Sequence, residues 1–154
     1  MAWSDVENVG TDKQKMIALV AGLHPRSCAK GLRRISRYED YHQHMSFVKE
    51  STYKENTHDV RFLLEHMVLP FPMVLAFKLP RIQSAGETKF EFTHGIFKDL
   101  KGTIRVAPVG NRCLYFLRAD WLGTTTGLAP IIVETFAQTL VKMGLEHLIR
   151  VSSI

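Results

Sequence analysis

The stretch from Gly127 to Ser152 constrains the fold most, because its apolar residues recur at helical spacing over many turns. One apolar stripe contains Ile132, Phe136, Leu140, Met143, His147 and Val151. Pro130 suits the first turn of a helix, where a backbone N–H has no helical partner. A helix of about 20 residues is roughly 30 Å long. Such a helix needs a wide apolar surface to pack on, and the preceding chain must supply that surface.

Most of the preceding chain is predicted to supply it as β-strands. Alternation is clearest in Lys89–Phe97, where Phe90, Phe92 and His94 would share one face. Further strands are predicted at 47–53, 60–69, 73–79, 103–106 and 113–121. In the segment 60–69, Phe62, Leu64, His66 and Val68 would face the same way. The apolar run 15–23 is predicted as a first strand, with a helix as the rival interpretation.

The segment 27–45 is predicted to hold two short helices. Ser27 is a suitable N-cap, and Leu32, Ile35, Tyr38 and Tyr41 recur at helical spacing. The order is therefore one strand, two short helices, six strands and one long helix. Strands joined by short turns form antiparallel sheets, so the sequence predicts an α+β fold. We expect a curved seven-stranded antiparallel sheet wrapped around the C-terminal helix.

The chain length of 154 residues fits one domain. We predict a flexible N-terminal segment at 1–14 and a single domain at 15–154. No apolar run approaches the roughly 20 residues that a membrane-spanning helix needs. Asp5 and Glu7 come early, and no small-x-small cleavage site follows the first apolar run. The sequence therefore predicts a cytoplasmic protein, or a periplasmic or secreted one if a signal peptide has been removed.

Charge and cysteines leave several interpretations open. The net charge is +5, and one basic segment contains Arg26, Lys30, Arg33, Arg34 and Arg37. This segment is either a solvated surface or attracts anionic lipid or nucleic acid. No aromatic residue is interleaved among these cations, so a base-stacking surface is not indicated. Cys28 and Cys113 lack zinc-ligand spacing, and the sequence does not decide between two buried thiols and a disulfide.

Three local patterns resemble the START-like superfamily, also called SRPBCC or Bet v 1-like. They are Phe90-x-Phe92-x-x-Gly95-x-Phe97-x-x-Leu100-x-Gly102-x-Ile104-x-Val106, Arg37-Tyr38-Glu39-Asp40-Tyr41 through Val48-Lys49-Glu50-Ser51, and Gly144-Leu145-Glu146-His147-Leu148. Within the superfamily, the chain looks most like the polyketide cyclase and coenzyme-Q-binding START-type group, over roughly residues 15–153. The resemblance implies a helix-grip fold with a cavity between sheet and helix that holds a hydrophobic ligand.

The candidate ligand-binding residues follow from that implied cavity and from the apolar faces. They are Phe62, Leu64, His66, Phe90, Phe92, His94, Phe136, Leu140 and Met143. His66 and His94 would orient a ligand or act as acid and base, or they are core histidines with local hydrogen bonds. Arg118 would bind a ligand oxygen if it faces inward, but the apolar count favours an inward face from Cys113 to Trp121 that leaves Arg118 solvated.

No metal site, cofactor or catalytic group is predicted. His42-x-His44 could be a metal pair on a strand, but it ends a helical stretch and has no third ligand nearby. The favoured function is binding or transport of a lipid, isoprenoid quinone or polyketide-like molecule, which leaves room for transient contact with a membrane surface. One alternative is a cyclase or dehydratase that uses the cavity histidines. Another is a ribosome- or protein-interaction module that uses the basic segment, and nucleic acid ranks low as a partner.

Overall fold

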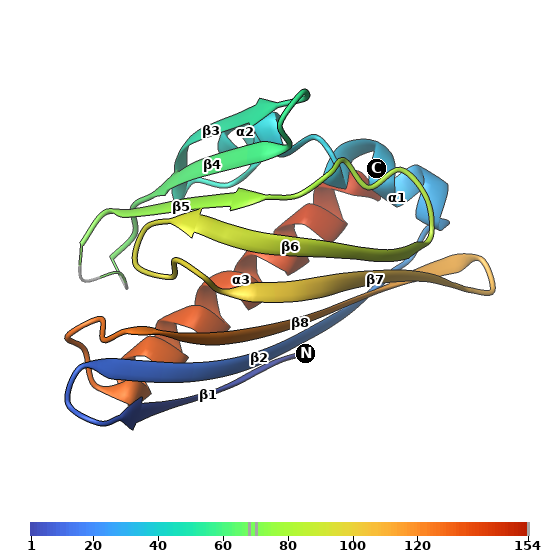
Figure 1. The fold of residues 1–154 in the computed structure, drawn as a ribbon. Helices are drawn as coiled ribbons and strands as arrows, with labels where there is room; N and C mark the ends of the chain where they lie inside the picture. The colour runs from blue at the N-terminus through green and yellow to red at the C-terminus, as the bar shows by residue number, and fades with distance from the viewer. Residues whose placement is uncertain (68, 70, 154) are drawn as a thin grey trace.

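An eight-stranded antiparallel sheet lies across one long C-terminal helix (Figure 1). The computed structural model describes residues 1–67, 69 and 71–153, without the side chain of Phe136. The elements are β1 (Ala2–Val9), β2 (Lys13–His24), α1 (Cys28–Ile35), η1 (Tyr38–Asp40), α2 (Tyr41–His44), β3 (Val48–Lys54), β4 (Asp59–Leu64), β5 (Met73–Lys78), β6 (Gly86–His94), β7 (Lys101–Val109), β8 (Arg112–Thr124) and α3 (Pro130–Ser152). The strand order is β1-β2-β8-β7-β6-β5-β4-β3. The predicted α+β fold is confirmed.

The sheet has one strand more than the seven predicted, because residues 2–9 form β1. Its side chains alternate: Ser4 and Val6 are buried, whereas Asp5 and Glu7 are exposed. β1 pairs along its whole length with β2, from Ala2 opposite Val20 onward. This segment was predicted to be loosely ordered. The prediction was wrong for β1 because the inward positions carry few apolar side chains, which hides the strand alternation.

Several strand ends differ from the predicted ones. β4 ends at Leu64, earlier than the predicted strand 60–69, and Val68 lies outside the described residues. β6 ends at His94, because Gly95 has a positive φ of 93°. A Cβ on Gly95 would lie 2.5 Å from the Val74 carbonyl oxygen, so this bend needs glycine. The run from Lys13 to His24 is a strand, as predicted, and not a helix.

Helix α3 buries a face slightly rotated from the predicted one. Val133 is fully buried and Leu140 is 8% exposed, and the helix packs on β1, β2 and α1. Ile132 and Met143, both placed in the predicted core stripe, are 47% and 38% exposed. The broad apolar composition of the helix leaves its rotation undetermined from sequence alone. Contacts with the sheet decide that rotation.

Polar side chains fix α3 against the first two strands. Glu134 Oε1 accepts a hydrogen bond from the Val6 backbone N–H at 2.6 Å, and Gln138 Nε2 donates to Ser4 Oγ at 3.0 Å. The fully buried Gln14 holds the loop before α3: its Nε2 donates to the Leu128 carbonyl at 2.9 Å. These bonds set both the position and the rotation of the helix.

A disulfide joins Cys28, the first residue of α1, to Cys113 of β8, with their Cα atoms 4.8 Å apart. This pairing answers a question that the sequence left open. It fastens α1 to the sheet, and Figure 1 shows α1 beside the C-terminal end of α3. Arg34 and Arg26 strengthen that contact by donating to the Val151 and Ser153 carbonyls at 3.2 and 3.3 Å.

Candidate functional site

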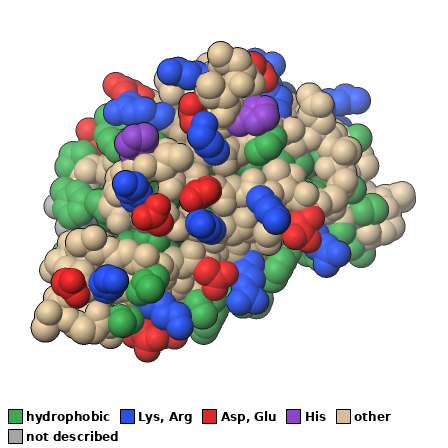
Figure 2. All heavy atoms as spheres, in the orientation of Figure 1, with side chains coloured by type: hydrophobic (Ala, Val, Ile, Leu, Met, Phe, Trp, Pro, Cys, Tyr) green, Lys and Arg blue, Asp and Glu red, His purple; other side chains and the backbone are tan. Residues whose placement is uncertain are grey.

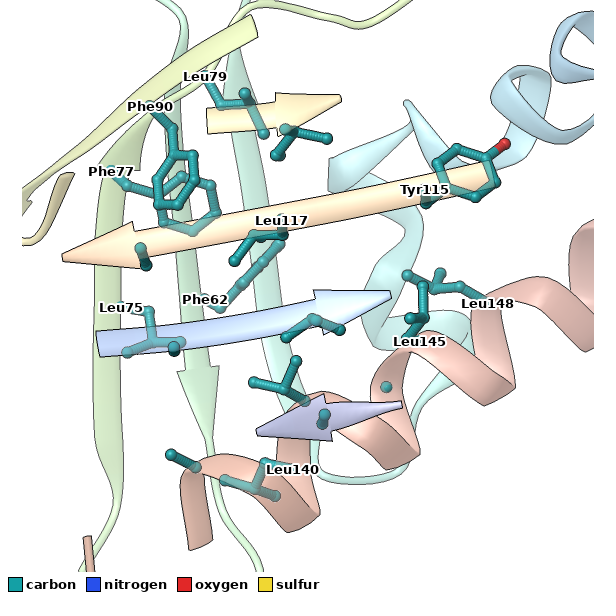
Figure 3. A pocket seen from close by; sticks show the side chains of 18 of the residues that line it. Phe62, Leu75, Phe77, Leu79, Phe90, Tyr115, Leu117, Leu140, Leu145 and Leu148 are labelled. Carbon is teal, nitrogen blue, oxygen red and sulfur yellow. The ribbon is translucent and has the colours of Figure 1, made fainter. Parts of the chain in front are cut away.

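A cavity of about 400 Å³ lies between the sheet, α3 and α1 (Figure 3). Its volume falls within the usual range of ligand pockets, which is roughly 300–1,000 Å³. Strands β2 and β4 to β8 contribute their inward-facing side chains, and α3 contributes Leu140, Leu145 and Leu148. The aromatic side chains of the wall come from Tyr38, Tyr41, Phe47, Phe62, Phe77, Phe90, Phe92, Phe97, Tyr115 and Phe116, among others.

The hydroxyl groups on this wall are mostly turned into the protein. Ser36 Oγ donates to the Leu32 carbonyl at 2.6 Å, and the Tyr38 hydroxyl donates to the Pro80 carbonyl at 3.0 Å. The Tyr41 hydroxyl donates to the Ile35 carbonyl at 2.5 Å. Burial raises the pKa of both tyrosines, so both hydroxyls stay protonated at physiological pH. The surface left to a ligand is therefore almost wholly apolar.

Tyr115 is the exception among the described wall hydroxyls, because its oxygen is buried without a hydrogen-bond partner. Figure 3 shows this hydroxyl pointing away from the labelled Phe and Leu side chains. It lies against α1, where a Cβ on Gly31 would come within 2.5 Å of the oxygen. Glycine therefore lets α1 approach the sheet at this point. Burial raises the pKa of Tyr115 to about 12.

His24 lies beside this contact and is fully buried. The Arg26 backbone N–H donates to His24 Nδ1 at 2.9 Å, so Nδ1 must carry its lone pair. The other ring nitrogen, Nε2, then bears the proton and donates to Ser152 Oγ at 2.8 Å. Desolvation lowers the pKa of His24, and the nearby charges of Arg26 and Lys30 lower it further. Sequence analysis missed His24 because it follows an apolar run without any motif.

Five of the sequence-predicted residues line the cavity: Phe62, Leu64, Phe90, Phe92 and Leu140. Tyr41 stacks on Phe62 with ring centroids 5.3 Å apart, and Phe77 stacks on Phe92 at 5.0 Å. The period-two alternation of β4 and β6 placed these side chains correctly. Their role in binding a ligand stays a prediction.

Three of the remaining predicted residues, His66, His94 and Met143, do not line the cavity. His94 is exposed, with Nδ1 3.0 Å from Thr93 Oγ1. The reason is a β-bulge: His94 pairs with Ala76 while Phe92 pairs with the next residue of β5, so the alternation breaks at Thr93. His66 follows the end of β4 and packs edge-on against Phe47. Met143 lies on the outer side of α3, and the side chain of Phe136 lies outside the described residues.

The other residues singled out from sequence take structural positions. Arg118 is exposed and pairs with Asp120 at 3.4 Å, in line with the predicted outward orientation. His42 Nδ1 lies 2.7 Å from Ser51 Oγ and 2.9 Å from the Glu39 carbonyl oxygen. Within residues 1–67, 69 and 71–153, no three potential metal ligands gather at one point. Within the same residues, no helix is both long enough and apolar enough to cross a membrane.

The chemistry available inside the cavity is mainly apolar contact. The described lining residues include no His, Asp, Glu, Lys or Arg, so they offer no general acid or base of ordinary pKa. Salt bridges lie outside the wall: Arg81 pairs with Glu39 at 3.1 Å and also with Glu55, and so ties the β5–β6 connection to η1. The arrangement is suited to enclosing an apolar molecule.

Comparison with solved structures agrees with this architecture. The Zhui aromatase/cyclase from Streptomyces sp. R1128 superimposes with a TM-score of 0.69 at 10% identity, covering 90% of this chain and 93% of that one. Ara h 8.0201 gives a TM-score of 0.69 at 7% identity, with 90% and 97% covered. A START superfamily protein from Mycobacterium smegmatis gives 0.62 at 14% identity, with 89% and 94% covered. The chain has the START-like, or Bet v 1-like, fold.

This likeness is one of fold. The identities are too low to carry an activity or a ligand from one START-like protein to another, and one fold hosts many functions. No protein-family model matches the sequence. No curated protein matches it either. The function must therefore be argued from the cavity itself.

Proposed function

We propose that the protein binds a hydrophobic small molecule in the cavity between the sheet and α3, and acts as a binding or transport module. The observation that carries this proposal is an apolar cavity of about 400 Å³ whose wall hydroxyls, apart from that of Tyr115, are bonded within the protein. Affinity would come from buried apolar area, at about 25 cal/mol per Å² before ordering costs. Lipids, isoprenoids and polyketide-like rings all fit that chemistry.

The enzyme alternative has less support. It requires an acid and a base within reach of one ligand atom, and its candidates His66 and His94 do not line the cavity. One structural neighbour is an aromatase/cyclase, but the wall described here lacks the ionisable groups such a step would need. Binding without chemistry is the simpler reading of an apolar wall.

Filling the cavity tests the proposal. Nile red, an apolar fluorescent probe, should bind the wild-type protein and raise its melting temperature, because a ligand specific to the folded state must stabilise it. Leu140→Trp adds a large side chain on the wall and should abolish both the fluorescence increase and the temperature shift. The matched control is Leu122→Trp, at a residue of β8 that is 54% exposed and does not line the cavity.

The proposal fails if Nile red binds the two variants equally, since the probe would then occupy some other surface. Circular dichroism of both variants checks that each remains folded. Native mass spectrometry of protein purified from its own host would then identify a bound molecule by its mass.

The disulfide supports one of the two compartments predicted from the sequence. Disulfides persist in oxidising compartments and are rare where thiols are kept reduced. The Cys28–Cys113 bond therefore supports the periplasmic or secreted alternative over the cytoplasmic one. Non-reducing mass spectrometry of protein taken directly from its host would distinguish the two, because the disulfide form is lighter by two hydrogen atoms.

A further inference from the structure

Helix α1 has two faces of opposite character. Its inner face carries Leu32 and Ile35, which line the cavity, and Gly31, which lies against Tyr115. Its outer face carries Lys30 and Arg33, which are exposed. One short helix thus separates the apolar cavity from a cationic surface. A helix with its side chains is roughly 10 Å across, so a partner on the outer face would lie within about that distance of the cavity.

We define the basic face as Arg26, Lys30, Arg33 and Arg34, in α1 and the turn before it. Two contacts join this face to the end of α3: Arg34 donates to the Val151 carbonyl and Arg26 to the Ser153 carbonyl. The chain has no acidic residue between Asp12 and Glu39. None of these four cations forms an ion pair with a described residue.

The outer face of the sheet is different in charge. Figure 2 shows Lys and Arg side chains interspersed with Asp and Glu side chains over that face. Several are paired, as Lys101 is with Glu91 and Arg118 with Asp120. Cations there largely cancel against neighbouring anions. Among the described residues, no anion is paired with the basic face in this way. Its field extends outward over about one Debye length, roughly 8 to 10 Å.

We propose that the basic face docks the protein on an anionic membrane surface, with α1 lying between the bilayer and the cavity. Two observations favour a lipid surface. Charge complementarity requires an anionic partner, and the inner face of the same helix walls a cavity suited to molecules that reside in membranes. The choice of a lipid surface rests in part on the proposed function, whereas the need for an anionic partner rests on the charge of the basic face alone.

Nucleic acid fits this face less well. Single-stranded nucleic acid is held by a basic groove with aromatic side chains on which bases stack. The stretch 26–37 contains no aromatic residue, and the basic face is the outer side of a short helix instead of a groove. A membrane surface makes no such demand, because anionic lipid attracts Lys and Arg near the surface without any need for a groove or stacking aromatics.

The experiment measures co-sedimentation of the full chain with vesicles of phosphatidylcholine alone and with added phosphatidylserine. Wild type should bind the phosphatidylserine vesicles, bind neutral vesicles poorly, and lose binding as salt rises. The double variant Lys30→Glu/Arg33→Glu should bind these vesicles at least about 25-fold more weakly than the wild type, because each Lys or Arg near anionic lipid is worth about fivefold in affinity. Neither side chain has a hydrogen-bond or ion-pair partner among the described residues, so the fold should be retained.

The matched control is Lys89→Glu/Lys98→Glu, two exposed lysines outside the basic face. Each double variant replaces two cations by two anions, which lowers the net charge by four units, from +5 to +1. Equal loss of vesicle binding in both variants would overturn the proposal, because net charge alone would then explain it. The proposal would also be overturned if the protein bound neutral vesicles and neither variant changed that binding. Salt-sensitive binding to RNA but not to vesicles would overturn it as well.

The Nile red assay separates this inference from the proposed function. The Lys30→Glu/Arg33→Glu variant should still take up the probe, because neither side chain lines the cavity. If the wild type did not bind Nile red, the proposed function would fail. The docking proposal would then still be tested by the vesicle co-sedimentation result.

Discussion

Tyr115 is the residue whose environment gives the sharpest test. Its hydroxyl is buried without a partner, and an unpaired buried hydroxyl costs about 1 to 3 kcal/mol by mutational data. Tyr115→Phe should therefore raise the free energy of unfolding by about 1 kcal/mol, measured by chemical denaturation. Tyr41→Phe is the control: its hydroxyl is bonded to the Ile35 carbonyl, so its removal should lower stability by about as much. A stability loss at both positions would mean that the Tyr115 hydroxyl is bonded in solution.

Gly31 belongs to the same contact and should be coupled to Tyr115. In the wild type a Cβ at residue 31 would meet the Tyr115 oxygen at 2.5 Å. Without that oxygen the next atom is His24 Cδ2 at 3.2 Å, a smaller overlap. Gly31→Ala should thus cost less stability in the Tyr115→Phe background than in wild type, and a double-mutant cycle measures the difference. Strict additivity of the two changes would argue against the contact.

His24 should make stability depend on pH. Its pKa is lowered in the folded protein from the ordinary value of 6.5, chiefly by desolvation, so the unfolded chain binds the proton more tightly. The stabilisation is therefore complete above pH 6.5 and is lost as the pH falls from 6.5 toward the lower folded pKa. Denaturation curves at several pH values should show this decline in wild type and a flatter profile in His24→Gln. The matched control is His94→Gln, which removes an imidazole from an exposed position away from this contact.

At the scale of elements, the rotation of α3 can be tested by paired truncations. Leu140 is 8% exposed on the cavity side, and Ile132 is 47% exposed on the outer side. Leu140→Ala should cost about 2 to 5 kcal/mol, toward the lower end because the cavity already leaves one side of Leu140 unpacked. Ile132→Ala should cost about 0.5 kcal/mol or less, as at other exposed positions. Denaturant unfolding of the two variants provides the measurement. A comparable loss at both positions would restore the stripe predicted from sequence, which contains both residues.

Elements with strong periodicity were predictable, and those whose signal depends on distant contacts were not. The alternation in β6 placed Phe90 and Phe92 on the cavity wall correctly. His94 follows the same alternation in sequence but faces out, because the bulge depends on how β5 pairs with β6. The strand β1 was missed since much of its inward face is polar and becomes buried through α3, as Ser4 does against Gln138. The Cys28–Cys113 pairing likewise needed the fold, because it joins residues 85 positions apart.

At the scale of the whole molecule, the sheet, α1 and α3 leave a gap that side chains do not fill. Three attachments hold α1 over this gap: the disulfide to β8, the close approach at Gly31, and the two arginine bonds to the end of α3. The β5–β6 connection contacts η1 through the Arg81–Glu39 ion pair and through the Pro80 carbonyl, which accepts from the Tyr38 hydroxyl. The cavity is thus walled by elements from every part of the chain, and its apolar character is a property of the assembled fold.

That apolar character predicts which ligands are rejected. A hydroxyl placed in the middle of a long chain must enter the cavity, where the described wall hydroxyls are bonded elsewhere or, in Tyr115, turned toward α1. A ligand hydroxyl that moves from water to such a wall loses its hydrogen bonds to water, which costs about 1 to 3 kcal/mol of binding free energy. Methyl stearate should therefore displace Nile red at least about fivefold more strongly than methyl 12-hydroxystearate, which has the same chain length.

Equal or tighter binding of the hydroxylated ester would mean that the cavity offers it a partner. Repeating the competition in Tyr115→Phe would show whether that partner is the phenol: loss of the hydroxylated ester's advantage would assign the hydrogen bond to Tyr115, and an unchanged ratio would place it elsewhere on the wall.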